Sequence, residues 1–462
     1  MEDGVEAFTE LAEILGPSKV RPWDPEALAD YGRDESGLPP RVPAAVAFAE
    51  STEDVRRVMR FASARRIPVS PCGARTGKSG GSLPAEGGIA LSLERMDRIL
   101  ELHAEDLTMV VQPGCVTGRV MEAAEAAGLF YPPDPNSWET CTIGGNVAEN
   151  AGGPRALKYG VTRDYVLGLE AVLPDGEVIR TGRRTIKGVA GYDLTALLVG
   201  SEGTLAVVTE ITLKLVPLPR EVRTALCLFP DAGAAARGVA RILAAGILPR
   251  TLEFFDDVAI DASSKRGPFR FPDSARAAIL AETDGDDGEG VTAQLARLGE
   301  IALAEGAVDV LLAHSESQRR DLWATRRQVS VALEDLHPLK ISEDVVVPRS
   351  LLPEAVERFK EVGRRRGFLV STYGHAGDGN LHANVLFDGE DRRPAAEACV
   401  EELVRIALEL GGTITGEHGV GLAKRDFLPW EQGELLVDLQ RRLKRVFDPA
   451  GILNPGKIFP GA

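Results

Sequence analysis

The sequence predicts an α+β protein with more than one domain, and three observations lead to this fold class. The chain has 462 residues, about three times the size of a common single domain. Its first half alternates short apolar strands with helices. After a proline-containing segment at 217–221, the second half shows the order strand–helix–strand–strand–helix–strand, which is typical of an antiparallel sheet covered by helices.

In the first half, two helices are expected at 5–15 and 25–32, before a buried strand at 44–49. Ser51 is the N-cap of a further helix that ends near Arg65. The following elements are strands at 67–73, 89–93 and 108–114, a helix at 117–127, a hairpin at 164–182, and strands at 197–203 and 205–219. The hairpin turns at Pro174-Asp175-Gly176.

In the second half, the apolar runs and helical periods alternate again. Strands are expected at 225–230, 252–256, 277–285, 308–313 and 345–348, and a hairpin at 368–387. Helices are expected at 231–245, 288–305, 315–332, 350–366, 394–410 and 431–447.

Composition and charge exclude several classes of function. The 53 Lys and Arg against 69 Asp and Glu give a net charge of -16, which opposes binding to nucleic acid. The sequence shows no apolar run long enough to span a membrane, and its acidic start does not resemble a signal peptide. We therefore expect a cytoplasmic protein without membrane insertion, associated with a membrane only through partner subunits. The five cysteines include no CxxC pair, which argues against disulfides and cysteine metal sites.

Three glycine-rich loops carry the first chemical signal. The segment PCGARTGKSGG (71–81) is one residue short of a P-loop between Gly73 and Gly77, and its glycines would break the helix that must follow. Such a loop can still bind an anion through backbone N–H groups. Similar loops occur at 141–160 and 199–205. Together they predict a long, phosphate-containing ligand, although each loop alone is also explained as a tight turn.

The segments PCGARTGKSGG, YPPDPNSWETCTIGGNVAENAGG and GYDLTALLVGSEGTLAVVTEITLKL resemble the FAD-binding domain of the PCMH/vanillyl-alcohol-oxidase flavoprotein superfamily. The chain is similar to its group of glycolate oxidase FAD subunits, D-lactate dehydrogenases and D-2-hydroxyglutarate dehydrogenases. The resemblance implies a two-subdomain PCMH-type FAD-binding domain at 1–219. It further implies an antiparallel-sheet substrate- and metal-binding cap domain at 220–425 and a helical tail at 426–462 that returns to the FAD domain.

The resemblance also implies a noncovalent FAD, because the matching loops contain no histidine. Arg75 departs from the family, where a glycine is common, and its side chain either turns outwards or approaches phosphate. The expected FAD-binding residues are Pro71, Gly73, Ala74, Arg75, Thr76, Gly77, Ser79, Gly80, Pro133, Asp134, Thr142, Gly144, Gly145, Asn146, Asn150, Gly152, Gly153, Tyr159, Glu202, Gly203, Val208 and Asn454.

A second signal is the histidine hairpin HAGDGNLH (375–382). A two-residue turn centred on Asp378-Gly379 would place His375 opposite His382, with Cβ atoms about 4.5–5.5 Å apart. Both rings could then bind one metal ion at about 2.0–2.1 Å. Glu417, in the segment GEHGVG (416–421), is a candidate third ligand. The alternative is a surface turn with polar histidines.

The family resemblance assigns roles to these residues. It implies that His375, His382 and Glu417 bind a divalent metal, which we expect to be zinc, and that His418 is the catalytic base. The helix at 321–330 resembles the family's substrate-binding helix, with Arg326 as the residue that binds the carboxylate.

Three further residues are candidates for substrate binding. Ser330 shares the helix face of Arg326, and Asn384 shares the strand face of His382. Lys340 is two residues from the position where the hydroxyglutarate branch has a lysine, and Ser342 stands at that position. This difference favours a small monocarboxylate as the substrate.

We therefore predict an FAD-dependent enzyme that oxidises a small 2-hydroxy acid, glycolate or D-lactate, to the 2-oxo acid. The alternatives are a D-2-hydroxyglutarate dehydrogenase, and a flavin-bearing subunit that is active only in a multi-subunit complex. A metal-dependent hydrolase without flavin would leave the glycine loops unexplained. The sequence leaves open the electron acceptor, for which a separate iron–sulfur or electron-transfer partner subunit is one option.

Overall fold

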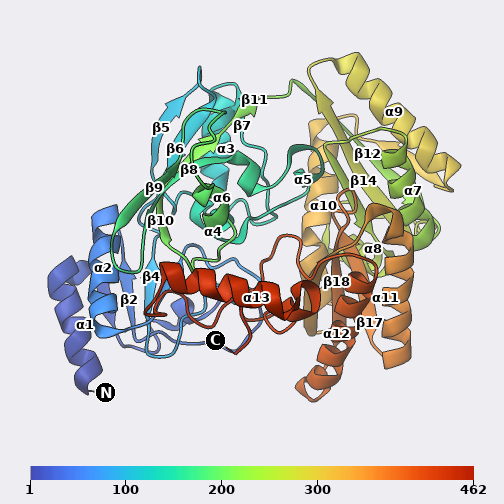
Figure 1. The fold of residues 1–462 in the computed structure, drawn as a ribbon. Coiled ribbons are helices and arrows are strands. Elements are labelled where there is room, and N and C mark those ends of the chain that lie inside the picture. The colour runs from blue at the N-terminus through green and yellow to red at the C-terminus, as the bar shows by residue number, and fades with distance from the viewer. Residues whose placement is uncertain (1, 462) are drawn as a thin grey trace. The chain divides into compact units, whose positions relative to one another are not determined.

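The computed structural model describes residues 2–461, and its contacts divide the chain into two compact units (Figure 1). The first unit contains the chain through Gly152, the segment Val161–Leu218 and the chain from Glu417 onward. The second contains Gly153–Gly160 and Pro219–Gly416. The chain thus leaves the first unit inside the proline-containing segment. The domain boundaries at 219/220 and 425/426 stay a prediction.

The first sheet of the first unit has the strand order β1-β2-β4-β3, in which β2, β4 and β3 run parallel. Its strands are β1 (Val20–Pro22), β2 (Ala45–Phe48), β3 (Val69–Cys72) and β4 (Ile89–Ser92). Helix α2 (Thr52–Arg65) follows β2, and its N-cap Ser51 accepts a hydrogen bond from the N–H of Asp54 (3.2 Å). Helix α1 (Glu2–Leu15) packs against α2. The βαβ alternation and the Ser51 cap are therefore confirmed.

The second sheet is antiparallel, with the order β5-β6-β10-β8-β9. Its strands are β5 (Ile99–His103), β6 (Thr108–Val111), β8 (Val166–Val172), β9 (Val178–Gly182) and β10 (Val207–Lys214). The predicted hairpin turns as expected, because Gly176 has a φ of 85° and Leu173 receives the N–H of Gly176 (2.9 Å). Helix α3 (Thr117–Ala126) follows β6, and the strands β7 (Leu129–Phe130) and β11 (Val216–Pro217) form a separate antiparallel pair.

Two expected elements did not form as predicted. The sequence prediction also lacked the helix at 257–266, and it placed at 345–348 a strand that lies at 339–346. The run at 197–203 is not a strand: it contains the end of helix α6 (Leu194–Leu198), which begins because Asp193 caps the N–H of Ala196 (2.9 Å). The run at 25–32 contains only the 3-10 helix η2 (Ala29–Gly32). There Asp24 accepts the N–H groups of Glu26 and Ala27, and such local turn bonds compete with a regular helix.

The second unit contains one sheet with the order β15-β12-β14-β13-β17-β18-β16. Every pairing in it is antiparallel, as predicted. Its strands are β12 (Glu221–Phe229), β13 (Thr251–Phe255), β14 (Ala277–Gly285), β15 (Asp309–Leu312), β16 (Leu339–Val346), β17 (Leu369–Gly374) and β18 (Asn380–Phe387).

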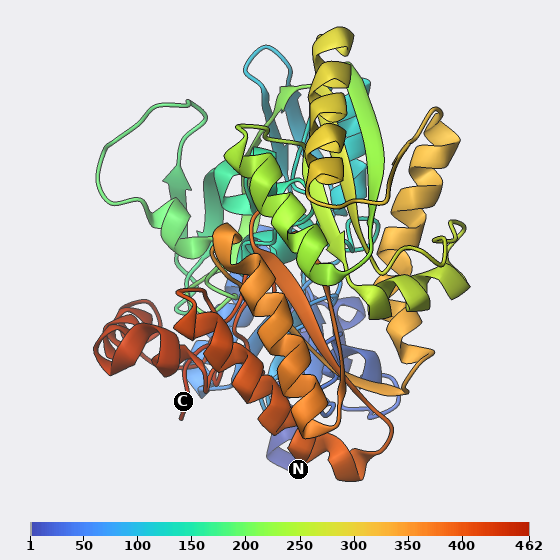
Figure 2. The same ribbon diagram turned by 90° about the vertical axis from the view of Figure 1, so that its right-hand side faces the viewer.

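Helices cover both faces of this sheet. Four of them form one layer, onto which Figure 2 looks: α7 (Ala232–Ala244), α9 (Gly288–Ala304), α11 (Leu352–Arg366) and α12 (Arg393–Glu409). The other face is covered by α8 (Asp257–Arg266) and α10 (Glu316–Glu334). The core between them includes Leu226, Phe255, Tyr373 and Val329. Polar residues that point to this second face are therefore held between the sheet and α10.

The remaining elements are short or lie near the C-terminus. They are α4 (Ile143–Glu149), α5 (Ala156–Tyr159), α13 (Leu428–Phe447), and the 3-10 helices η1 (Pro17–Lys19), η3 (Thr162–Tyr165), η4 (Arg349–Leu351) and η5 (Glu390–Arg392). Within the described residues, no helix is long and apolar enough to cross a membrane. All five cysteines are buried free thiols.

Candidate active site

The first glycine loop follows β3 and has a backbone that explains part of its sequence. Arg75, at the position where the family commonly has glycine, has a φ of 60°, in the left-handed region that glycine adopts most easily. Its guanidinium lies 4.4 Å from the ring centre of Tyr31 and donates to the carbonyl of Gly73 (3.2 Å). The Arg75 side chain is therefore held against protein groups. Pro71, Ala74, Thr76, Gly77, Ser79 and Gly80 lie in the same strand end and loop.

The second loop begins α4 and approaches the first loop closely. Thr142 is the N-cap of α4, and its hydroxyl accepts the N–H of Gly145 (3.4 Å). A Cβ atom on Gly73 would lie 2.3 Å from that hydroxyl oxygen, so only glycine fits at position 73. The amide of Asn146 donates to Thr117 (2.8 Å). These contacts place the predicted Thr142, Gly144, Gly145 and Asn146 beside the predicted Gly73.

The third loop and the C-terminal tail complete this group. Glu202 has a φ of 52°, and its carboxylate accepts the N–H groups of Val420 and Gly421 (2.7 Å each). Asn454, with a φ of 43°, donates from its amide to the carbonyls of Gly81 (2.9 Å) and Glu202 (2.8 Å). A Cβ on Gly203 would lie 3.0 Å from Pro71. One asparagine therefore ties two of the loops together.

The segment that carries His418 is fixed to the first loop. The N–H groups of Leu422 and Ala423 both donate to the carbonyl of Ser79 (2.8 and 3.0 Å). A Cβ on Gly421 would lie 2.2 Å from that same oxygen. The segment after the proposed base His418 therefore contacts two of the proposed FAD loops, through Val420 and Gly421 to Glu202 and through Leu422 and Ala423 to Ser79.

Two buried polar atoms test whether this region fits a phosphate-containing cofactor. The Ser79 hydroxyl and the Asn454 amide oxygen are buried and have no hydrogen-bond partner among the described residues. Buried polar atoms are rarely left without a partner. Together with the N-terminus of α4 and the close glycine contacts, they fit a group such as FAD that supplies the missing partners.

A pair of buried carboxyl groups lies in the same region. Burial, followed by the charge of Glu202, raises the pKa of Glu149 well above its ordinary value. Burial also raises the pKa of Glu202, although its two backbone N–H donors act in the opposite direction. A Cβ on Gly419 would lie 2.0 Å from one Glu149 oxygen and 3.1 Å from one Glu202 oxygen. The pKa of Glu149 is therefore raised more strongly than that of Glu202, which alone has the backbone donors.

The other predicted cofactor residues have varied surroundings. Asn150 ends α4 and accepts the N–H of Arg163 (2.9 Å). Val208 lies on β10 opposite Ala171, and Pro133 and Asp134 follow β7. Tyr159 belongs to the second unit with Gly153, and its hydroxyl donates to Asp284 (2.7 Å). A Cβ on Gly152 would lie 2.9 Å from a Glu417 oxygen.

The histidine hairpin has a different register from the predicted one. Tyr373, not His375, lies opposite His382, because the strands separate at Gly374 and a five-residue loop (375–379) replaces the two-residue turn. The N–H groups of Asp378 and Asn380 both donate to the carbonyl of His375 (3.2 Å each) and close this loop. The two rings still meet, with centres 5.3 Å apart and planes at 84°.

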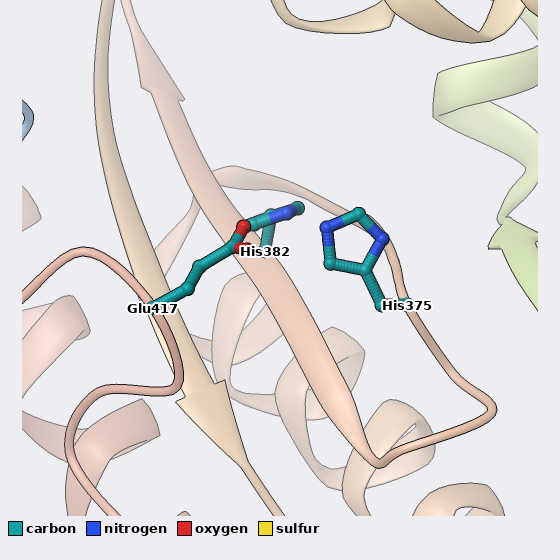
Figure 3. Close-up of side chains that lie close together, drawn as sticks. All are labelled: His375, His382 and Glu417. Atoms are coloured by element: carbon teal, nitrogen blue, oxygen red, sulfur yellow. The ribbon is translucent and has the colours of Figure 1, made fainter. Parts of the chain in front are cut away.

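The proposed metal ligands gather at this hairpin (Figure 3). His375, His382 and Glu417 each offer one ligand atom, and these atoms all lie within 4.8 Å of one another. Both histidines are buried and Glu417 is partly buried. Two imidazoles and one carboxylate form a common ligand set for a catalytic divalent metal. The donor types and their convergence therefore fit a metal ion.

Asp344 explains why Glu417 lies there. Glu417 directly follows Gly416, the last residue of the second unit. The carboxylate of the fully buried Asp344 accepts the N–H of Gly416 and the hydroxyl of Thr415 (2.8 Å each). Asp344 itself lies opposite His382 in the β16–β18 register. The sheet that carries one histidine therefore also holds the segment that leads to Glu417.

The substrate candidates lie on the sheet face covered by α10. Lys340 on β16 and Asn384 on β18 point to the same face of the sheet as His382, because side chains two residues apart on a strand share a face. Lys340 donates to the hydroxyl of Ser330 (3.0 Å) on α10 and pairs with Glu334 (2.8 Å). The amide oxygen of Asn384 is buried without a partner among the described residues.

Arg326 is held on the same face by a residue that the sequence analysis missed. Nε and Nη2 of Arg326 lie 2.8 and 2.6 Å from Oε2 of Glu253, and Nδ1 of His375 lies 2.7 Å from Oε1. Burial alone raises the pKa of Glu253, but the charges and hydrogen bonds of His375 and Arg326 outweigh burial, so its pKa lies below the ordinary value. A lone glutamate in LEFFD gives no sequence signal. Only its two partners reveal its role.

The comparisons with known proteins agree with this fold and identify the family. The family model for "FAD linked oxidases, C-terminal domain" matches residues 218–458, and that for "FAD binding domain" matches 43–182. The chain is 42% identical to the glycolate oxidase subunit GlcD of Bacillus subtilis over 97% of this chain and 96% of that protein. It is 37% identical to the D-lactate dehydrogenase of Anaerostipes hadrus over 98% and 96%.

Two solved structures show the same fold. They are p-cresol methylhydroxylase with substrate bound (TM-score 0.80, 18% identity, 98% of this chain and 96% of that one) and 4-ethylphenol oxidase from Gulosibacter chungangensis (TM-score 0.78, 21% identity, 100% and 98%). This likeness confirms the predicted PCMH-type fold with its antiparallel-sheet second domain.

The chain belongs to the FAD-linked oxidases, so it is an FAD-dependent oxidoreductase. Within that family it is of the glycolate oxidase and D-lactate dehydrogenase type, as its sequence predicted.

Proposed function

We propose that the chain is a catalytic flavoprotein that oxidises glycolate or D-lactate to the 2-oxo acid. The observation that carries this proposal is the ligand set His375, His382 and Glu417, together with the link from His375 through Glu253 to Arg326. A subunit that only carried flavin would not need these groups.

In this proposal each side chain has a separate task. Arg326 binds the substrate carboxylate, because Glu253 occupies its Nε and Nη2 edge and leaves the Nη1 edge for an anion. His418 accepts the hydroxyl proton at its imidazole as general base. The Asn384 amide is available to hold the substrate on the same sheet face. Together these groups fix the orientation of the α-carbon.

A cofactor and a metal ion, held by the residues described above, would complete the chemistry. FAD, when bound, supplies the acceptor for the hydride of the α-carbon. A divalent metal at His375, His382 and Glu417, when bound, supplies a Lewis acid for the hydroxyl oxygen; we propose zinc. We also propose that the three glycine loops bind FAD noncovalently.

The contacts of Lys340 favour a small substrate with one carboxylate. Its ammonium is engaged by the carbonyl and hydroxyl of Ser330 and by Glu334. Binding a second substrate carboxylate would require it to exchange these partners. D-2-Hydroxyglutarate is therefore the less favoured substrate, and a monocarboxylate leaves the lysine in place.

An anaerobic spectral titration tests the proposal. The purified protein is mixed with glycolate, D-lactate, L-lactate and D-2-hydroxyglutarate, and the flavin absorbance is recorded. We expect glycolate or D-lactate to bleach the flavin. If none of the four bleaches it, the catalytic proposal is wrong for the isolated chain, and a subunit that is active only in a complex replaces it.

Arg326→Lys separates binding from folding. Lysine cannot make the bidentate contact, so the KM for the 2-hydroxy acid should rise about tenfold or more. Arg327→Lys, one residue further along α10, is the matched control and should keep the KM of the wild type. Equal KM values for the two variants would remove Arg326 from the substrate site.

Reduced flavin also needs an electron acceptor. Two relatives, from Bacillus subtilis and Escherichia coli, are named as glycolate oxidase subunits. We propose that a separate redox subunit reoxidises the flavin here, since the five buried cysteines form no cluster motif that would hold an iron–sulfur centre in this chain. Co-purification of a redox-active protein with the tagged chain checks this proposal.

A further inference from the structure

Glu253 connects two groups of the proposed site. It lies in the middle of β13, and its side chain is fully buried. Oε1 faces Nδ1 of His375 (2.7 Å), and Oε2 faces Nε and Nη2 of Arg326 (2.8 and 2.6 Å). Burying a carboxylate is costly unless it is paired and hydrogen-bonded. Each oxygen of Glu253 meets this requirement with a different partner.

The contact with His375 determines which ring nitrogen is available to a metal. An ionised carboxylate only accepts hydrogen bonds, so Nδ1 of His375 must be the donor. The neutral ring then presents the lone pair of Nε2. Ligating histidines commonly have such a carboxylate behind them, which fixes the ring and makes it a better ligand.

The contact with Arg326 determines which edge of the guanidinium meets the substrate. Glu253 takes the Nε and Nη2 edge, while Tyr373 and Phe255 place their ring centres 5.0 and 5.9 Å from the guanidinium carbon. The arginine therefore has one orientation. Its charge is partly balanced by Glu253, which keeps the buried site from holding an uncompensated cation.

We propose that Glu253 is a positioning residue that couples the metal ligand His375 to the substrate-binding Arg326. The inference rests on the proposed function, because it assumes that these two residues bind metal and carboxylate. Its consequence is that one carboxylate sets both the metal affinity and the substrate affinity, although it is expected to touch neither ligand.

Glu253→Gln is the first test because it changes charge at constant shape. A glutamine has one acceptor oxygen and one NH₂ group, so an N–H must face either the guanidinium or Nδ1–H. It cannot satisfy both partners. We expect about 10–100-fold weaker binding of zinc to the metal-free protein, measured by competition with a chelator. The KM for glycolate or D-lactate should rise as well.

Glu282→Gln is the matched control. Glu282 is a buried glutamate on the neighbouring strand β14, and it also faces α10, where it accepts hydrogen bonds from Trp323 (2.7 Å) and Arg319 (3.3 Å). None of its partners is a proposed ligand. This variant should lose stability but bind zinc as the wild type does. Flavin absorbance per chain shows whether each variant has folded.

Glu253→Asp is a second variant that keeps the charge but is one methylene too short to reach both partners. We expect its zinc affinity to lie between the affinities of the wild type and of Glu253→Gln. Wild-type zinc affinity and KM in both Glu253 variants would overturn the coupling.

A third measurement needs no change at Glu253. The chain has six histidines, so the imidazole ¹⁵N signals of labelled metal-free protein can be assigned with His375→Gln. After zinc is added, Nδ1 of His375 should carry the proton and Nε2 should bind the metal, and a proton on Nε2 with zinc at Nδ1 would overturn the inference. If the wild type binds no zinc and no hydroxy acid bleaches it, the proposed function itself fails. If it does both and Glu253→Gln behaves as Glu282→Gln does, only the role of Glu253 fails.

Discussion

Asn454 joins the C-terminal tail to two of the proposed FAD loops, and its replacement should release flavin. The buried amide donates to the carbonyls of Gly81 and Glu202. Leaving a buried acceptor without its donor costs about 1–3 kcal/mol, so Asn454→Ala should lower the stability by roughly 2–4 kcal/mol. With about 2–4 °C per kcal/mol for a unit of this size, the melting temperature should fall by roughly 5–15 °C.

The backbone at this position adds a second, separable effect. Asn454 has a φ of 43°, and alanine in the left-handed region costs about 1–2 kcal/mol. Asn454→Gly loses the same hydrogen bonds without that strain, so it should be more stable than Asn454→Ala by about 1 kcal/mol.

The assay is thermal unfolding followed by circular dichroism, together with flavin absorbance after gel filtration. Both variants should retain less FAD than the wild type, and added FAD should restore part of the lost melting temperature. Wild-type melting and flavin content in Asn454→Ala would refute the hydrogen-bond argument. Equal stability of the alanine and glycine variants would refute the backbone argument.

Three further predictions concern other buried groups. Asp344→Ala removes the acceptors that hold Gly416, so zinc should bind at least about tenfold more weakly, while flavin content should stay unchanged; a wild-type zinc affinity would contradict this. Burial lowers the pKa of Lys457 to about 8 from 10.5, so the unfolded chain binds more protons between these values and stability rises with pH. Relative to Lys457→Met, the wild type should gain about 2 kcal/mol from about pH 7.5 to about pH 9.5, and a constant difference would contradict the shift. Burial raises the pKa of Glu149, so the stability that its proton gives falls as pH rises from the ordinary glutamate value through the raised one. Glu149→Gln should keep its FAD at neutral pH and melt higher than the wild type in alkaline buffer, and equal melting temperatures there would contradict the shift.

Local signals in the sequence were enough for most elements. Ser51 capped its helix as expected because a cap is a bond between residues three apart. The hairpin at 164–182 formed because Pro174-Asp175-Gly176 has few other conformations. The strand predicted at 197–203 was wrong because Asp193, which lies before this apolar run, caps a helix that ends inside the run.

The histidine hairpin shows where local reasoning ends. Asp378-Gly379 is a strong two-residue turn signal, but the loop extends back to His375. A Cβ on Gly379 would lie 2.2 Å from the carbonyl of Val347, the residue directly after β16, so the end of that neighbouring strand shapes the loop. That strand is outside the hairpin, and its influence cannot be read from the sequence of the turn.

By itself, the sequence determined the α+β fold class and most of the elements, because these depend on periodicity and on local motifs. The flavin loops and the site residues stay predictions from the same motifs. The tertiary structure alone decided that Tyr373 pairs with His382, that Asp344 holds the segment before Glu417, and that Glu253 joins Arg326 to His375. These partners are 72 to 122 residues apart or on different strands. A contact over such a separation exists only once the sheet and α10 have packed, since no local preference of the chain specifies it.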